Sequence, residues 1–478
     1  MKTTARFYSS LGLLLVLNVL VKPLWIFGID RPVQNLAGTA VYGAYFALFN
    51  LAFMLNFLLD WGLSTFLNRE LAADPAAYSR KTGFFLRLKL VMLLLYGTIV
   101  FFIARASGIE NQRWLWLLIG IQSLTSLFLF ARAIISAHQW FRTDAVFSVL
   151  DKILMLLLCG GFLLFPAWGQ LSIDRFLWIQ LICTGIALIA ALIMLWKKGI
   201  RFSITNTHDK IRPIFRTALP YALIVLLMSA HYRLDGFLLE RLHPQGAYEA
   251  GIYAGAYRLL DAANMAGYLL VSFLLPFIAR HQPEKSVVNE AVLFIRHFLL
   301  LMAFGVTAMA LLLAPWMQSL LYHNDSPAAI TVLQYCLPAL IGYSLVQVYG
   351  TVLTATGHIW TLSGIVLVAL LLNTGLNLYW IPTHGALGAC YAALISQTAC
   401  GMACMLMARH KTGLSVQWQS LFTTILIGAM LFCFLYFGQS FISNRTVLIS
   451  AGVVFVLGMA VITRLVDLRK WKQLFINH

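Results

Sequence analysis

The stretch from Phe176 to Trp196, FLWIQLICTGIALIAALIMLW, contains no charged residue, and the basic stretch KKGIRFSITNTHDKIRP follows it at residues 197–213. About 20 apolar residues are enough for an α-helix to cross the hydrocarbon core of a bilayer. A run of this length that ends in lysines is typical of a transmembrane helix that stops at the cytoplasmic surface. This pattern recurs along the chain and predicts a polytopic membrane protein.

Hydropathy predicts fourteen membrane spans in the 478 residues, which leaves room for short loops only. The apolar segments are long and continuous, and this excludes a β-barrel, whose strands alternate in hydropathy. The expected fold is therefore an all-α polytopic membrane protein. The predicted spans lie near residues 7–29, 40–66, 83–104, 114–137, 145–168, 176–196, 214–239, 251–278, 291–313, 330–354, 360–381, 387–408, 420–441 and 447–465.

Composition and charge agree with this interpretation. Hydrophobic residues make up 61% of the chain, charged residues 11%, and the mean hydropathy is +0.83. A net charge of +17 would suggest nucleic acid as the partner of a soluble protein. Here 21 of the 34 Lys and Arg residues fall in segments on one side of the predicted membrane and 6 on the other. This bias predicts that both termini are cytoplasmic and that nucleic acid is not a partner.

The sequence contains no motif of a known catalytic or metal site. There is no P-loop and no H-E-x-x-H, and all seven cysteines lie inside predicted spans. The first apolar run has no A-x-A-like site after it, so we expect an uncleaved span rather than a signal peptide. We expect no cofactor, no metal and no enzymatic activity, with transport driven by H⁺ or Na⁺, the membrane potential or a downhill substrate.

Ionisable residues inside spans are costly in a bilayer and tend to face a cavity or a partner. Lys22 lies deep in the first span, shares a helical face with Asn18, and precedes Pro23, so a bend is expected there. The seventh span carries His231, Arg233 and Asp235.

Two further spans carry polar stripes. The eighth span has the widest one, from Tyr253 to Tyr268 at helical spacing, and Arg258 lies close enough to Asp261 to pair. The eleventh span carries an asparagine pair at i, i+4. Such stripes predict a shared hydrated cavity, with hydrogen-bonded helix packing as the alternative. The predicted substrate-binding residues are Lys22, Asn18, Arg233, Arg258, Tyr257, Asn264, Asn373 and Asn377, and the candidates for ion coupling or gating are Asp60, Asp235, Asp261 and His231.

Other charges within spans lie near predicted cytoplasmic ends, and for these we expect anchoring, local ion pairing or a role in a cytoplasmic gate. These residues are Asp60, Arg87, Lys89, Arg132, Asp151 and Lys152. Asp30, Arg31, Glu240, Arg241 and Glu249 fall in predicted outer loops, where they are interpreted as gate or surface charges.

A short internal repeat suggests how the spans are grouped. The second span begins VYGAYFALFN at Val41, and the eighth begins IYAGAYRLLD at Ile252, six spans later. Parallel repeats of this kind occur in alternating-access transporters. We therefore expect two pseudo-symmetric six-helix lobes and two extra helices: an N-lobe at 1–197, a cytoplasmic linker at 198–213, a C-lobe at 214–410, and spans 13–14 with a cytoplasmic tail at 411–478.

These features together resemble one transporter group. The segment from Val33 to Leu71 is similar to the "YG-x-Y … D-x-G" pattern of the polysaccharide-transporter branch of the multidrug/oligosaccharidyl-lipid/polysaccharide exporter superfamily, here with Tyr42, Gly43, Tyr45, Asp60 and Gly62. The stretch GIYAGAYRLLDA in the eighth span is the second similar segment. Drug antiporters of this superfamily tend to carry a carboxylate in the first span, where this chain has a lysine.

The resemblance implies a flippase of the bacterial inner membrane that moves undecaprenyl-pyrophosphate-linked oligosaccharide units by alternating access, for assembly of O-antigen, capsule or exopolysaccharide. It implies that basic cavity residues meet the pyrophosphate or acidic sugars, and that spans 13 and 14 line a groove for the lipid tail. Expected partners are the lipid-linked oligosaccharide, membrane lipids, a coupling H⁺ or Na⁺, and a polysaccharide polymerase or ligase. The alternatives are an ion-coupled drug or metabolite antiporter of the same fold and a membrane-embedded glycosyltransferase or polymerase.

Overall fold

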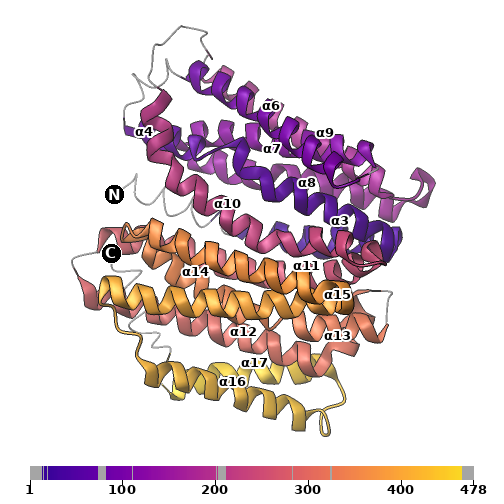
Figure 1. Cartoon of the computed structure of the whole chain (residues 1–478), viewed down its shortest axis with the longest axis vertical. Coiled ribbons are helices and arrows are strands. Elements are labelled where there is room, and N and C mark those ends of the chain that lie inside the picture. The colour runs from indigo at the N-terminus through magenta and orange to yellow at the C-terminus, as the bar shows by residue number, and fades with distance from the viewer. Residues whose placement is uncertain are drawn as a thin grey trace. The chain divides into compact units, whose positions relative to one another are not determined.

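The computed structural model describes residues 13, 16–18, 20–73, 82–109, 111–200, 202, 211–281, 284–322, 326–463 and 465. All regular secondary structure in these ranges is helical, as predicted (Figure 1). A helix satisfies every backbone N–H and C=O within its own segment, which lipid requires because it offers no hydrogen bonds. By internal packing the chain divides into unit 1, Met1–Arg241, and unit 2, Leu242–His478.

In unit 1 the described residues up to 25 are helical, and residues 20–25 run directly into a π-helix. The chain thus stays helical through Pro23, and the irregularity expected near Lys22 begins four residues after it, at Ile26. The further elements are η1 (Ile26–Asp30), α2 (Arg31–Ala37), α3 (Thr39–Met54), η2 (Leu55–Leu59), α4 (Leu63–Ala73), α6 (Thr82–Ala106), α7 (Gln112–Ala137), α8 (Phe141–Leu164), η3 (Pro166–Trp168), α9 (Ile173–Lys197) and α10 (Ile211–Leu242).

Unit 2 contains seven described helices, the longest of 54 residues. They are α11 (Gly246–Arg280), α12 (Lys285–Leu321), α13 (Pro327–Cys336), α14 (Ala339–Ala355), α15 (Ile359–Thr412), α16 (Trp418–Gly438) and α17 (Arg445–Ile462). The predicted lobe boundary at 198–213 precedes α10, whereas the packing divides the chain after that helix. The assignment of residues to lobes stays a prediction.

The described residues contain 12 helices that are long and apolar enough to cross a membrane. Helix α15 is one of these, although it comprises two predicted spans on either side of Gly385. The first predicted span lies partly outside the described residues. The prediction of about fourteen spans is consistent with this arrangement.

One predicted span is interrupted, and two others are joined without a loop. The second was expected to be continuous over 40–66, but the helix ends at Leu59 and restarts at Leu63, with Trp61 and Gly62 at positive φ. Within α15, Gly385 has φ 54° and ψ −132°, which reverses the chain without a separate loop. Glycine takes such angles with little strain because it has no Cβ.

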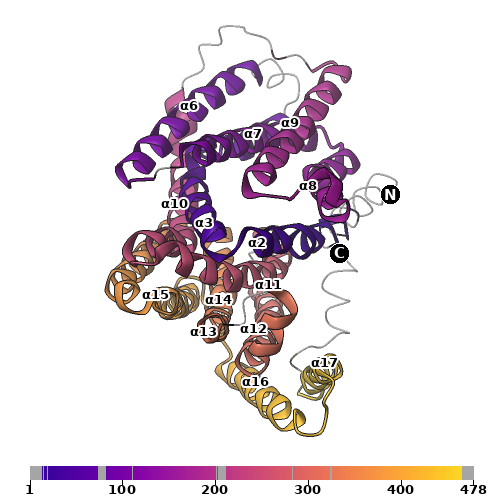
Figure 2. The same ribbon diagram turned by 90° about the vertical axis from the view of Figure 1, so that its right-hand side faces the viewer.

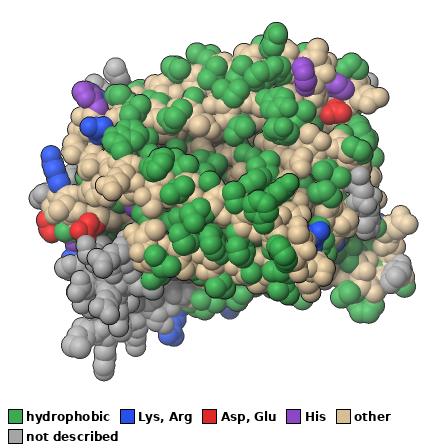
Figure 3. Space-filling model, turned by 90° about the horizontal axis from the view of Figure 1, so that it is seen from below, with side chains coloured by type: hydrophobic (Ala, Val, Ile, Leu, Met, Phe, Trp, Pro, Cys, Tyr) green, Lys and Arg blue, Asp and Glu red, His purple; other side chains and the backbone are tan. Residues whose placement is uncertain are grey.

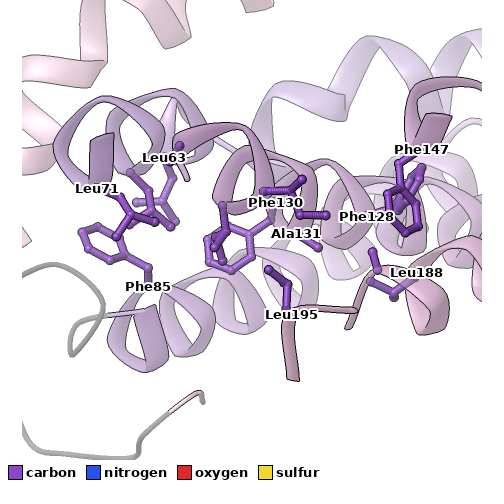
Figure 4. Close-up of a cluster of buried hydrophobic side chains, with 14 of the residues drawn as sticks. Leu63, Leu71, Phe85, Phe128, Phe130, Ala131, Phe147, Leu188 and Leu195 are labelled. Atoms are coloured by element: carbon purple, nitrogen blue, oxygen red, sulfur yellow. The ribbon is translucent and has the colours of Figure 1, made fainter. Parts of the chain in front are cut away.

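Apolar side chains hold each unit together. In unit 1, residues of α4, α6, α7, α8 and α9 interdigitate around Phe128 and Phe130, as Figure 4 shows. In unit 2, α14 and α15 touch backbone to backbone: a Cβ added at Gly342 would lie 2.6 Å from the Thr398 nitrogen. Small residues at such a contact are typical of helices packed in membranes.

Helices α16 and α17 lie at the edge of unit 2, beside α12 (Figure 2). Only 17% of the most apolar stretch of α17 is buried. Figure 3 shows the molecule from below relative to Figure 1. Hydrophobic side chains dominate this face, and its charged side chains lie toward its ends. This distribution suits helices that face lipid on one side.

Candidate functional site

Unit 1 contains a cluster of charged side chains among its apolar spans. Lys22 lies within electrostatic range of Lys152, Arg132 and Asp151. Asp151 pairs with Lys152 at 3.1 Å, and the guanidinium of Arg132 on α7 donates to Asp144 on α8 at 2.8 Å. We call these five residues the basic cluster. Three bases against two acids leave it with one excess positive charge.

Two contacts fix the geometry of the cluster. Asn18 is buried and donates from Nδ2 to the Ser148 hydroxyl at 2.9 Å, which ties the first span to α8. The Lys152 ammonium lies 4.9 Å from the centroid of the Trp25 ring. A cation over an indole face gains about 0.5–2 kcal/mol, and the larger values belong to desolvated sites.

Sequence reasoning did not foresee this cluster. Arg132, Asp151 and Lys152 were interpreted as helix-end charges, but the structure brings them to Lys22. Lys152 lies eleven residues into α8, which is about 16 Å of helix. The depth of Lys152 in its helix is the signal that could have identified the cluster, because a lysine so far from a helix end does not reach the membrane interface easily.

Asp60 and Lys89 form an ion pair, and Ser64 also donates to Asp60. Anchoring, local ion pairing or a gate role was expected for Lys89, and the structure shows it fully buried in an ion pair. Asp60 lies at the interruption after η2, and its side chain is 32% exposed. The ion pair therefore holds α6 against the break in the second span. The coupling or gating role of Asp60 stays a prediction.

The polar residues of α10 lie against α3 within unit 1. The Arg233 guanidinium lies 4.9 Å from the centroid of the Phe53 ring. His231 and Asp235 are both buried, and the His231 ring stacks on Tyr232. Gly236 allows the close approach, since a Cβ there would come 2.7 Å from Phe46.

In unit 2, the predicted stripe of α11 is largely buried. Tyr257, Arg258 and Asn264 are each less than a tenth exposed, whereas Asp261 is half-buried. Asn264 accepts a hydrogen bond from Gln347 of α14 at 2.6 Å. A residue larger than glycine at Gly267 would overlap the same Gln347.

The asparagine pair of α15 is fully buried. Asn377 donates to Asn373 at 3.0 Å, and Asn373 donates to Ser396 in the second half of the same element at 3.3 Å. The two asparagines do share a face, as their spacing predicts. Their hydrogen bonds join two spans, which is the geometry of helix packing, and their contact with substrate stays a prediction.

The three acids expected in outer loops, Asp30, Glu240 and Glu249, all lie in helices, and two of them have clear structural partners. Asp30 is buried at the end of η1, where both carboxylate oxygens accept from the Tyr42 hydroxyl at 3.1 Å. Glu249 lies in the first turn of α11 and accepts from the Ala386 nitrogen at 2.8 Å, directly after the reversal at Gly385. Both carboxylates therefore have structural contacts that hydropathy did not reveal.

An apolar groove of about 600 Å³ lies in unit 2 between α12, α16 and α17. Its walls include Phe298 and Met302 of α12, Leu431 of α16, and Val456 of α17. Gly305 leaves open space on the α12 wall, since the nearest atom to an added Cβ would be 3.9 Å away. Among the residues that the structure describes, no three His, Cys, Asp or Glu side chains gather as a metal site.

Comparisons with known proteins agree with this architecture. The inward closed lipid II flippase MurJ superposes with a TM-score of 0.73 at 13% identity, covering 95% of this chain and 99% of that one. An inward-facing multidrug resistance MATE transporter of the MOP superfamily gives 0.66 at 15%, covering 83% and 94%. The MATE transporter VcmN of Vibrio cholerae gives 0.60 at 15%, covering 87% and 99%.

These identities are low and establish the fold alone. No curated protein is matched by the sequence itself. A profile of the family described as polysaccharide biosynthesis proteins matches residues 11–282, which is more than half of the chain. The chain therefore belongs to the polysaccharide biosynthesis protein family, with the transporter fold that MurJ and the MATE proteins share.

Proposed function

We propose that this protein is a flippase that carries undecaprenyl-pyrophosphate-linked oligosaccharide units from the cytoplasmic to the outer leaflet of the bacterial inner membrane, by alternating access, for assembly of surface polysaccharide. Such a substrate has an anionic pyrophosphate, an apolar polyprenyl chain and a hydroxylated saccharide. The observation that carries the proposal is the basic cluster of unit 1, to which Lys22 belongs.

The cluster suits the pyrophosphate because it has more positive than negative charge within apolar spans. Basic groups in apolar surroundings attract anions strongly. Charges inside a membrane are unfavourable, so those that occur there usually serve a function. Asp151 and Asp144 hold the bases in place when the anion is absent. An arriving pyrophosphate would compete for Lys22 and Lys152 first.

The groove of α12, α16 and α17 suits the lipid chain. Its lining is apolar, and burial of apolar surface is worth roughly 25 cal/mol per Å² of surface removed from water. In lipid the gain is smaller and comes from packing alone. We propose that the groove guides a segment of the polyprenyl chain while the polar parts cross.

The remaining parts of the proposal concern orientation, energy and partners. The bias of 21 bases to 6 supports cytoplasmic termini in the inner membrane. Asp60, Asp235, Asp261 and His231 are the proposed groups for coupling to H⁺ or Na⁺. The product would pass to a polysaccharide polymerase or ligase on the outer side.

A deletion strain tests the proposal. Lipid-linked sugar units should accumulate on the cytoplasmic side, and surface polysaccharide should be lost and then restored by the wild-type gene. Lys22→Ala combined with Lys152→Ala should restore at least tenfold less polysaccharide, with normal amounts of protein in the membrane. Arg142→Ala, an exposed base on the same helix as Lys152, is the matched control and should restore it fully.

Other results would contradict the flippase. Normal surface polysaccharide in the deletion strain, with altered drug sensitivity, would favour an antiporter of this fold. Single sugar units that reach the outer surface but fail to lengthen would favour a polymerase. Full activity of the double lysine variant would remove the basic cluster from the mechanism.

A further inference from the structure

A second cavity lies at the end of unit 1 that the charge bias predicts to be the outer one. It has a volume of about 540 Å³ and is bounded by α3, the connection between α6 and α7, and α10. All its lining residues belong to unit 1. A cavity of this size is within the range of small-molecule sites, which is about 300–1,000 Å³.

Small side chains form one wall of this cavity. Ala40, Ala44 and Ala47 line it at spacings of four and three residues, so they share one face of α3. Val41 and Leu48 extend the same wall. Alanines leave open the space that larger side chains would fill, which gives a flat ligand room to lie against the helix.

The opposite wall carries a compensated pair of charges. Glu240 and Arg241 pair at 2.6 Å, and their side chains are 18% and 28% exposed. Arg241 also donates to the Ser107 carbonyl at 2.6 Å, at the end of α6. The wall thus offers carboxylate acceptors beside guanidinium donors, with a net charge of zero.

An indole completes the lining and is held rigidly. Trp114 lines the cavity, and its Nε1 donates to Asp174 at 2.8 Å. The other oxygen of Asp174 pairs with Arg113 at 3.0 Å. A ring held in this way presents apolar area at little cost in conformational entropy.

This chemistry differs from that of the basic cluster. A phosphate would gain little from a wall whose charges already cancel. A hydroxyl group both donates and accepts, so a ligand with neighbouring hydroxyls can engage the carboxylate and the guanidinium at once. The apolar face of a sugar ring can meanwhile lie on the indole or on the alanines.

We infer that this cavity binds a sugar ring of the saccharide. The inference rests on the proposed function for the choice of a saccharide over other hydroxylated ligands, and it deepens that function by giving the sugar a contact separate from the pyrophosphate cluster. The cavity would hold the sugar at the outer end of unit 1.

Saturation-transfer NMR on the full-length protein in lipid nanodiscs tests the inference. The probes are the methyl glycosides of glucose, galactose, mannose and N-acetylglucosamine, with free glucuronate. At least one should receive saturation from the wild type, and the transfer should fall at least fivefold in Arg241→Gln and in Ala44→Phe. Ala44→Phe fills the cavity without removing a polar group, so it remains informative if Arg241→Gln folds poorly.

The controls separate this cavity from other contacts. Arg105→Gln removes an exposed base of α6 that does not line the cavity, and it should keep wild-type transfer. Displacement of the sugar by inorganic pyrophosphate would overturn the inference, as would equal transfer in all variants or no transfer from the wild type. If the protein binds sugar but the deletion strain makes normal polysaccharide, the sugar-binding inference stands and the flippase proposal fails. If the deletion strain shows the flippase phenotype but the protein binds no sugar, the flippase proposal stands and the sugar-binding inference fails.

Discussion

The basic cluster of unit 1 gathers Lys22, Arg132 and Lys152 among apolar helices, whereas the groove of unit 2 is lined by apolar side chains of α12, α16 and α17. One region keeps charge where a membrane makes it costly, and the other offers an apolar groove. A substrate with an anionic part and a long apolar part would use both regions.

The largest effect is a loss of folding stability, expected when the Asp60–Lys89 pair is broken. In contrast to the basic cluster, this pair is a charge in unit 1 with a structural role. Asp60→Asn removes the counter-charge of a fully buried ammonium. Breaking a buried pair costs about 3–5 kcal/mol, and we expect about 3 because Asp60 is one-third exposed. Thermal unfolding of the purified protein in detergent measures the loss.

The double variant Asp60→Asn, Lys89→Met should recover most of that stability, since no charge is left buried. If stability returns but polysaccharide export does not, Asp60 acts in coupling as well as in packing. An unchanged unfolding midpoint in the single variant would contradict the structural role of the pair.

A several-fold effect is expected from filling the groove. Gly305→Phe places a ring in the open space on the α12 wall and should reduce export several-fold without lowering protein levels. Gly458→Phe is the control, because nothing lies within 4 Å of an added Cβ there and the residue does not line the groove. Complementation of the deletion strain compares the two. Equal export in both variants would show that the lipid chain does not use the groove.

The smallest effect is expected at Trp25. Trp25→Leu keeps apolar volume but removes the aromatic face beneath Lys152, which is worth about 0.5–2 kcal/mol. Export should fall about two- to fivefold in a complementation assay, less than in the double lysine variant. Trp25→Phe should retain part of the activity, since phenylalanine keeps a weaker face. A Leu variant as inactive as the double lysine variant would mean that Trp25 does more than support Lys152.

The helices could be predicted well because hydropathy depends on local sequence. The long apolar helices and the shared face of Asn373 and Asn377 follow from composition and period. The interruption at Asp60–Gly62 was missed because it lies inside an apolar run, where continuous hydropathy hides a local change of backbone.

The candidate site could be predicted only in part. Lys22 stood out because a lysine deep in a span is costly, yet its neighbours come from α7 and α8, more than 100 residues along the chain. Which spans lie side by side depends on side-chain fit between helices, and one sequence does not contain that information in readable form. The same holds for Lys89, whose partner Asp60 lies on another span.

The reversal at Gly385 has a practical consequence for mapping the topology of this protein. Two spans meet there without a loop, and the Glu249 carboxylate caps the start of the second one through the Ala386 nitrogen. A reporter or epitope inserted at this turn would separate the cap from the helix that it serves. The connection between α16 and α17, where Ser440, Phe441 and Ser443 are exposed, is the sounder place for a tag on unit 2.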